Sequence, residues 1–274
     1  MMRIFQTFWT KPMDEDRLRK NVYIAALSLR YAQKSGYYVV MYTDSVGYEL
    51  LKDLGYDEIN TYLDNIPEDV NPSQFFAYPK FFAGLKEELG SLHTDFDVFL
   101  KKPCVNIFFE DKTIDIILQC EEYHQKEYEK NCKVICEHEY PEILKIKNMH
   151  YSSNVGIIGF NNKELKEIYY SWYFDYIDFY KTKLTYIKNC LSELISEQVN
   201  INYLIKTKKY NCYYLLPIDN DIYEERKKLN VIANKIGYQH LQGGCKYNES
   251  NFLEIKTILK YKFPETYNLV KKNI

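Results

Sequence analysis

Residues 91–103 read SLHTDFDVFLKKP, an apolar stretch that holds two carboxylates, Asp95 and Asp97, one residue apart. The apolar residues predict a buried β-strand over 91–100. Two unpaired carboxylates in such a dry position would cost free energy, which a bound cation would offset. Because carboxylates at this spacing can reach the same hard cation, the stretch predicts that Asp95 and Asp97 bind a metal ion. The alternative is that Asp97 only starts a turn and Asp95 caps a neighbouring segment.

Strands and helices alternate along the rest of the chain. Apolar runs predict strands at 3–8, 37–42, 58–62, 114–120, 155–160 and 212–216. Apolar residues at helical spacing predict helices at 18–29, 48–54, 79–89, 163–180 and 192–207. This order indicates an α/β fold with a mostly parallel central sheet flanked by helices. No repeat, low-complexity tract or flexible linker divides the chain, so we expect a single domain over 1–274.

Composition excludes several classes of protein. The 36 basic and 38 acidic residues give a net charge of -2, so we expect no nucleic-acid partner. No uncharged apolar stretch reaches the roughly 18 residues of a membrane-spanning helix, and the first residues contain no signal-peptide core. The 7 cysteines are odd in number and scattered, which favours a reducing, cytoplasmic location. The 28 tyrosines suit either a core or a sugar-binding surface.

A second motif, HLQGGCK, occupies residues 240–246. The imidazole of His240 can complete a metal shell begun by carboxylates, and it favours Mn²⁺ over Mg²⁺, which prefers oxygen ligands. Glycines such as Gly243 let the backbone approach an anion, and the ammonium of Lys246 can meet phosphate oxygens. The alternative is an ordinary glycine turn between a surface histidine and a solvated lysine.

Together the two motifs resemble glycosyltransferase family 8, retaining enzymes of the GT-A fold. In that family a DxD strand and a C-terminal HxxGxxK segment share one metal ion and the diphosphate of a nucleotide-sugar donor. The resemblance therefore implies a GT-A type nucleotide-diphospho-sugar transferase fold, with Asp95, Asp97 and His240 as metal ligands and Lys246 and Gly243 beside the diphosphate.

Other segments extend this resemblance. Residues 151–161, YSSNVGIIGFN, are similar to the strand that follows in the family, and Asn154 matches an asparagine near the donor sugar and acceptor. Residues 196–204, SEQVNINYL, match a segment near the reacting carbon, which implies catalytic roles for Glu197 and Gln198. Lys80 stands where the family usually has a donor-binding arginine.

The whole chain also resembles an uncharacterised bacterial family of transferase-like proteins that open with a phrase such as FQTFWTKP, here residues 5–12, and finish with HLxGGxK. Two departures concern the shape of the diphosphate site. Tyr247 and Asn248 replace the usual Pro-Trp after the final lysine, and His93 and Thr94 precede Asp95 where a more apolar pair is common.

The resemblance implies a metal-dependent hexosyltransferase that uses Mn²⁺ or Mg²⁺ and a nucleotide diphosphate sugar, a UDP-hexose by family habit. The acceptor would be a glycan or a lipid-linked molecule, and the configuration at the anomeric carbon would be retained. The polar loop after strand 37–42, with Thr43 and Asp44, lies where such sheets bind ligands, so we expect both residues to contact the donor.

Alternative functions remain open from the sequence. Every proposed ligand would serve a non-catalytic nucleotide-sugar-binding protein equally well. A haloacid dehalogenase-type phosphatase would use Asp95 as nucleophile and residues 219–221, Asp-Asn-Asp, as further metal ligands. Cys132, Cys136 and His138 suggest a zinc site without a second ligand pair.

The C-terminal residues 246–274 combine six lysines and three glutamates with apolar residues. This pattern favours helices packed on their own domain, with peripheral contact to an anionic membrane, at its inner face, as the alternative.

Overall fold

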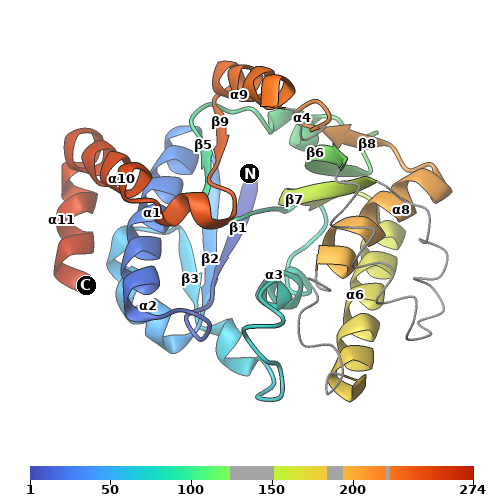
Figure 1. The fold of residues 1–274 in the computed structure, drawn as a ribbon, viewed down its shortest axis with the longest axis horizontal. Helices are drawn as coiled ribbons and strands as arrows, with labels where there is room; N and C mark the ends of the chain where they lie inside the picture. Colours follow the sequence, from blue (N-terminus) through green and yellow to red (C-terminus); the bar gives the residue numbers. More distant parts are fainter. Residues whose placement is uncertain (124–150, 184–193, 220–222) are drawn as a thin grey trace.

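The computed structural model describes residues 1–123, 151–183, 194–219 and 223–274 (Figure 1). Its main sheet has seven strands among these residues, in the order β3-β2-β1-β4-β7-β6-β8. The strands are β1 (Arg3–Phe8), β2 (Tyr38–Thr43), β3 (Glu58–Asn60), β4 (Leu92–Thr94), β6 (Ile116–Tyr123), β7 (Tyr151–Phe160) and β8 (Cys212–Tyr214). Only β7 runs antiparallel to its neighbours. The predicted α/β class with a mostly parallel sheet is therefore confirmed.

The chain begins with β1, α1 (Glu15–Lys34) and β2, which pairs parallel with β1. Asp14 caps α1, because its carboxylate accepts a hydrogen bond from the backbone N–H of Arg17 at 2.8 Å. Gly36 has a φ of 89°, a left-handed conformation that suits glycine and turns the chain into β2. These local signals confirm the strand and helix predicted at the start of the chain.

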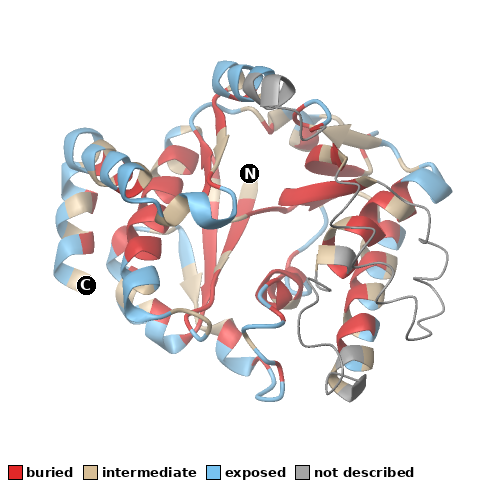
Figure 2. Ribbon diagram, viewed as in Figure 1, coloured by how far each residue is buried: buried red, intermediate tan, exposed pale blue. Residues whose placement is uncertain are grey.

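Helices cover both faces of the sheet (Figure 1). On one face lie α1, α2 (Ser45–Leu51), α10 (Glu249–Lys262) and α11 (Pro264–Asn273); on the other lie α3 (Tyr78–Gly84), α6 (Lys163–Lys183) and α8 (Asn200–Lys208). Each face of the sheet has its own hydrophobic core. Successive residues of β1 point to opposite faces, so Ile4 is buried in the core beside α1 and Phe5 in the core beside α3. Figure 2 shows the buried residues along the strands and on the helix sides that face them.

The predicted strand 91–100 is wrong as a single element. It forms β4 in the main sheet and β5 (Val98–Leu100), which pairs antiparallel with β9 (Tyr238–His240) in a separate two-stranded sheet. The chain turns between them because the N–H of Val98 donates to the carbonyl of Asp95 at 2.9 Å. The turn places Asp95 and Asp97 between the two sheets.

Six further elements lie in the described part of the chain. They are η1 (Lys52–Leu54), η2 (Tyr62–Asn65), α4 (Asn106–Glu110), the π-helical turn η4 (Ile195–Val199), α9 (Tyr223–Ile236) and η5 (Gly243–Tyr247). The predicted helix 192–207 is described from residue 194 onward, as η4 followed by α8. The proposed zinc ligands Cys132, Cys136 and His138 lie outside the described residues, as do Asn220 and Asp221.

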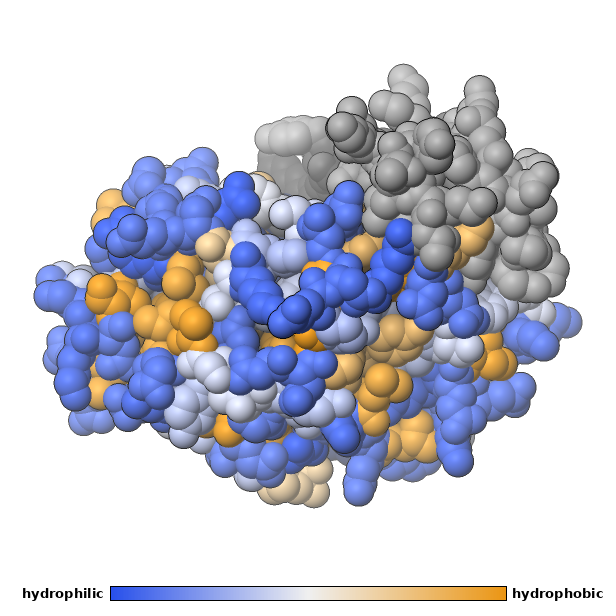
Figure 3. Space-filling view, turned by 90° about the horizontal axis from the view of Figure 1, so that it is seen from below, coloured by the Kyte–Doolittle hydropathy of each residue, from blue (hydrophilic) through white to orange (hydrophobic). Residues whose placement is uncertain are grey.

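The C-terminal helices α10 and α11 pack on α1. Phe252, Leu259 and Val270 are buried with residues of α1, and the rings of Phe252 and Tyr23 lie 5.5 Å apart. None of the described helices is long and apolar enough to cross a membrane. Figure 3 shows that apolar groups on the face seen from below Figure 1 are interrupted by hydrophilic side chains.

Candidate functional site

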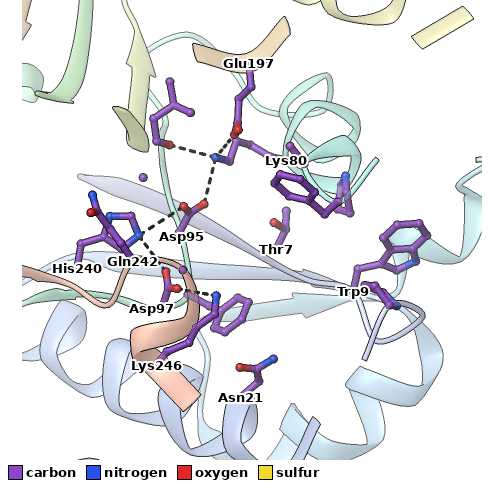
Figure 4. Close-up of a pocket in the computed structure, with 18 of the residues that line it drawn as sticks. Thr7, Trp9, Asn21, Lys80, Asp95, Asp97, Glu197, His240, Gln242 and Lys246 are labelled. Carbon is purple, nitrogen blue, oxygen red and sulfur yellow. Dashed lines mark hydrogen bonds and ion pairs between the residues drawn. The ribbon is translucent and has the colours of Figure 1, made fainter. Parts of the chain in front are cut away.

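Asp95, Asp97 and His240 form one cluster, with one ligand atom from each within 4.8 Å of the others. His240 Nε2 lies 3.3 Å from Asp97 Oδ1 and 3.8 Å from Asp95 Oδ2 (Figure 4). The β5–β9 ladder brings these distant segments together, because Val98 pairs with His240. The side chain of Asp97 is 5% exposed and that of Asp95 is 32% exposed, so the cluster is buried on one side and open on the other.

The residues of this cluster fit a divalent cation. Asp97 Oδ1 is buried and has no hydrogen-bond partner among the described residues, which costs free energy that a cation would offset. Burial alone would raise the pKa of Asp97, but the ammonium of Lys246 and the neighbouring imidazole of His240 hold it well below its usual range. Two carboxylates and an imidazole form a donor set suited to Mn²⁺.

Lys246 closes one side of the cluster. Its Nζ donates to Asp97 Oδ2 at 2.8 Å and lies 5.3 Å from the centre of the Phe96 ring. Burial would lower the pKa of Lys246, but the carboxylate of Asp97 outweighs this and raises it, so the ammonium stays charged. Gly243 begins the turn that carries Lys246, with a φ of 57° that favours glycine.

Lys80 lies on the opposite side of Asp95. Its buried Nζ lies 2.6 Å from Glu197 Oε1 and 3.1 Å from Asp95 Oδ1, and it also donates to the carbonyl of Val155 at 3.1 Å (Figure 4). Burial opposes the charge on Lys80, but the two carboxylates raise its pKa. Burial raises the pKa of Glu197 despite this lysine. Lys80 thus links the predicted metal ligands to the predicted catalytic turn.

Asn154 and Glu122 lie on neighbouring strands of the main sheet. Asn154 Nδ2 donates to Glu122 Oε1 at 2.7 Å, and Asn154 Oδ1 accepts the N–H of Gly156 at 3.0 Å. The sequence analysis did not single out Glu122, which lies just beyond the strand predicted at 114–120. Glu122 is 6% exposed.

One cavity of about 670 Å³ unites most of the predicted site. It is lined by nine of the predicted residues: Lys80, Asp95, Asp97, Asn154, Glu197, Gln198, His240, Gly243 and Lys246. Glu122 lines the same cavity. The cavity therefore places the candidate metal ligands, two lysines and the proposed catalytic side chains around one space.

Thr43 and Asp44 do not line this cavity. Thr43 is fully buried, and its Oγ1 donates to the carbonyl of Phe8 at 2.7 Å. Asp44 caps α2 by accepting the N–H of Gly47 at 2.9 Å, and it accepts the N–H and the hydroxyl of Thr10, each at 2.8 Å. Both residues hold the end of β1 in place. The donor contacts expected at Thr43 and Asp44 therefore lie outside the cavity.

Trp9 and Asn21 line the cavity but were missed by the sequence prediction. Trp9 Nε1 and Asn21 Oδ1 are buried and have no hydrogen-bond partner among the described residues. Figure 4 shows Trp9 on the opposite side of the view from His240. A donor and an acceptor left unpaired at a cavity wall are available to a ligand. The only sequence signal was that Trp9 belongs to the FQTFWTKP phrase.

Solved structures that align with the chain are glycosyltransferases of low sequence identity. The galactosyltransferase LgtC, crystallised with donor and acceptor sugar analogues, is 10% identical with a TM-score of 0.46, over 97% of this chain and 100% of that chain. Mouse xyloside xylosyltransferase 1 is 13% identical with a TM-score of 0.43, over 77% of this chain and 84% of that chain. The glycosyltransferase GlyE of Streptococcus pneumoniae is 11% identical with a TM-score of 0.45, over 97% of this chain and 64% of that chain.

No curated protein sequence matches this chain. A model described as a family of unknown function (DUF6734) matches residues 2–273, and the chain therefore belongs to that family.

Proposed function

We propose that this protein is a metal-dependent glycosyltransferase of the GT-A type. It would move a hexose from a nucleotide diphosphate sugar, a UDP-hexose, to a glycan or lipid-linked acceptor with retention of configuration. The observation that supports this function most directly is the convergence of Asp95, Asp97 and His240 beside Lys246 in one cavity.

Asp95, Asp97 and His240 would hold Mn²⁺ or Mg²⁺, which would supply positive charge to the diphosphate as it leaves. Lys246 would bind the same diphosphate, because its ammonium lies at the carboxylate that also faces the cation site. Stabilising the charge of the leaving group is the main contribution that these residues would make to the rate.

Glu197 and Gln198 lie on the π-helical turn η4 at the cavity wall. Both would act near the anomeric carbon, where positive charge develops as the bond to the diphosphate breaks. The ammonium of Lys80 lies 2.6 Å from Glu197 and would hold that carboxylate in position. Asn154 and Glu122, which are hydrogen-bonded to each other, would bind hydroxyl groups of the donor sugar or acceptor.

The nucleoside end of the donor would lie near Trp9 and Asn21. The indole N–H of Trp9 can donate to a base or ribose oxygen, and Asn21 Oδ1 can accept from an N–H or hydroxyl of the nucleoside. This placement gives the two unpaired polar atoms a partner at the same time.

Peripheral membrane contact would accompany a lipid-linked acceptor. The exposed side chains of Lys271 and Lys272 on α11 are available for anionic headgroups. Sedimentation with anionic liposomes tests this contact. The Lys271→Glu, Lys272→Glu double variant should lose binding, and unchanged binding, or none by the wild type, would reject it.

A thermal-shift panel tests the proposed function. UDP and UDP-hexoses should raise the melting temperature only when Mn²⁺ is present, because binding to the folded state stabilises it. Failure of every nucleotide diphosphate and nucleotide sugar to do so with Mn²⁺ would exclude the proposed donor site. Binding without release of UDP, across varied acceptors, would instead favour the non-catalytic alternative.

A further inference from the structure

Gln119 on β6 contacts the imidazole of His240 from the side opposite the carboxylates. Its Oε1 lies 2.7 Å from His240 Nδ1, whereas His240 Nε2 faces Asp95 and Asp97. The side chain of Gln119 is buried, so this contact lies away from water. A metal-binding imidazole commonly donates its other ring N–H to such a fixed acceptor, which orients the ring.

The neighbour Tyr238 indicates which end of the Gln119 amide faces His240. The hydroxyl of Tyr238 donates to the same Oε1 at 2.6 Å. Tyr238 is buried, and its phenol O–H requires an acceptor there. The amide oxygen therefore accepts from Tyr238 and from His240 Nδ1–H. In the neutral imidazole, Nε2 then carries the lone pair that faces the two carboxylates.

Gly156 on β7 provides the space for this contact. A Cβ at position 156 would lie 2.5 Å from His240 Cε1, 2.7 Å from His240 Nδ1 and 2.8 Å from Gln119 Oε1. Cβ atoms do not approach side chains so closely, so a larger residue would force the imidazole or the amide to move. The strand therefore holds open the position in which the ring and the amide meet.

We infer that Gln119 is a positioning residue that selects the Nδ1–H tautomer of His240 and thereby sets the affinity of the cluster for a divalent cation. This inference rests on the proposed metal site. Gln119 does not line the cavity, so it acts on a bound ion through His240 alone. Loss of comparable hydrogen-bond partners weakens metal binding by about 10- to 100-fold.

The experiment titrates the full chain with Mn²⁺ alone and measures free Mn²⁺ by electron paramagnetic resonance. Gln119→Met, which removes the acceptor, should raise the Kd for Mn²⁺ by about 10- to 100-fold. Gln119→Glu keeps an acceptor oxygen and should stay close to wild type. Gln74 is exposed and outside the cavity, so Gln74→Met is the matched control and should bind as wild type.

The outcomes separate this inference from the metal site itself. Wild-type affinity in Gln119→Met would overturn the role of Gln119 and leave the metal site standing. Absence of Mn²⁺ binding by the wild-type chain would overturn the metal site. A ¹⁵N NMR spectrum of the metal-free wild type must show the Nδ1–H tautomer of His240; the Nε2–H tautomer there would overturn the positioning role even if Gln119→Met failed to fold.

Discussion

Val98 pairs with His240 across the antiparallel ladder of β5 and β9, and Leu241 then donates its N–H to the carbonyl of Asp97 at 3.1 Å. This backbone connection, rather than any contact between the side chains, brings His240 to the carboxylates. The arrangement of the three candidate ligands is therefore built into the backbone of the two-stranded sheet. Such preorganisation favours binding because few groups must be reordered.

Asp97→Asn should abolish stabilisation by Mn²⁺. The substitution removes a buried carboxylate oxygen that faces His240 and also the counterion of Lys246. If the wild type is held at 100 times its Kd, Mn²⁺ should stabilise it by about 2.7 kcal/mol, and the variant by almost nothing. Urea unfolding with and without Mn²⁺ measures the difference. Asp53→Asn, at an exposed site in η1, should keep the full effect, and a variant as responsive as the wild type would contradict the metal assignment.

Lys80→Met should destabilise the fold strongly. Removing the ammonium leaves the buried carboxylate of Glu197 without its ion-pair partner, and breaking a buried ion pair in this way costs roughly 3–5 kcal/mol. Urea unfolding measures the loss. Adding Glu197→Gln should recover part of the stability, because the uncompensated charge is gone. Equal stabilities of the single and double variants would show that the pair is not coupled.

Gly156→Ala should weaken Mn²⁺ binding and stability together. The added Cβ would displace the His240 ring or the Gln119 amide, and overpacking of this kind costs about 1–3 kcal/mol. Gly244→Ala is the matched control, because a Cβ there meets nothing within 4 Å. Mn²⁺ titration and urea unfolding of both variants check this. Unchanged Mn²⁺ affinity in Gly156→Ala would show that the ring can shift without loss.

The sequence predicted the elements whose signals are local. The apolar runs at 3–8 and 37–42 and the helical spacing of apolar residues at 18–29 suffice to predict β1, α1 and β2. The two motifs singled out Asp95, Asp97 and His240, because carboxylates and imidazole have a recognisable chemistry, and the structure brings the three side chains together.

What the sequence did not predict depends on contacts between distant segments. The predicted strand 91–100 is interrupted by a turn at Asp95, and its second part, β5, pairs with β9. The sequence gives no sign of β9, because this three-residue strand has no apolar run. Gln119 and Glu122 both lie on β6, whose sequence indicates only a strand, and the register of β6 against β7 and the placement of His240 bring them to the site.

Glu87 should make the free energy of unfolding depend on pH. It is buried, which would raise its pKa, but hydrogen bonds from Arg3 and Tyr42 outweigh burial and lower the pKa below its ordinary value of 4.5. A folded-state pKa below the unfolded one stabilises the fold above about pH 4.5, and this contribution is lost as pH falls through the folded value. Urea midpoints should therefore fall between pH 7 and pH 3 by more in the wild type than in Glu87→Gln. Glu88→Gln, at the exposed neighbouring position, should follow the wild type, and parallel curves for all three proteins would contradict the assignment.

Trp9→Phe should weaken nucleotide binding without affecting Mn²⁺. The substitution keeps an aromatic ring at the cavity wall but removes the buried indole N–H, which has no partner among the described residues. Loss of one neutral hydrogen bond of about 0.5–1.5 kcal/mol corresponds to a rise of roughly 2- to 13-fold in the Kd for UDP. Calorimetric titration with UDP in the presence of Mn²⁺ measures it, and Mn²⁺ titration alone should give the wild-type Kd. Trp172 lies on α6 and outside the cavity, so Trp172→Phe is the matched control. Equal UDP affinities for all three proteins would place the nucleoside elsewhere in the cavity.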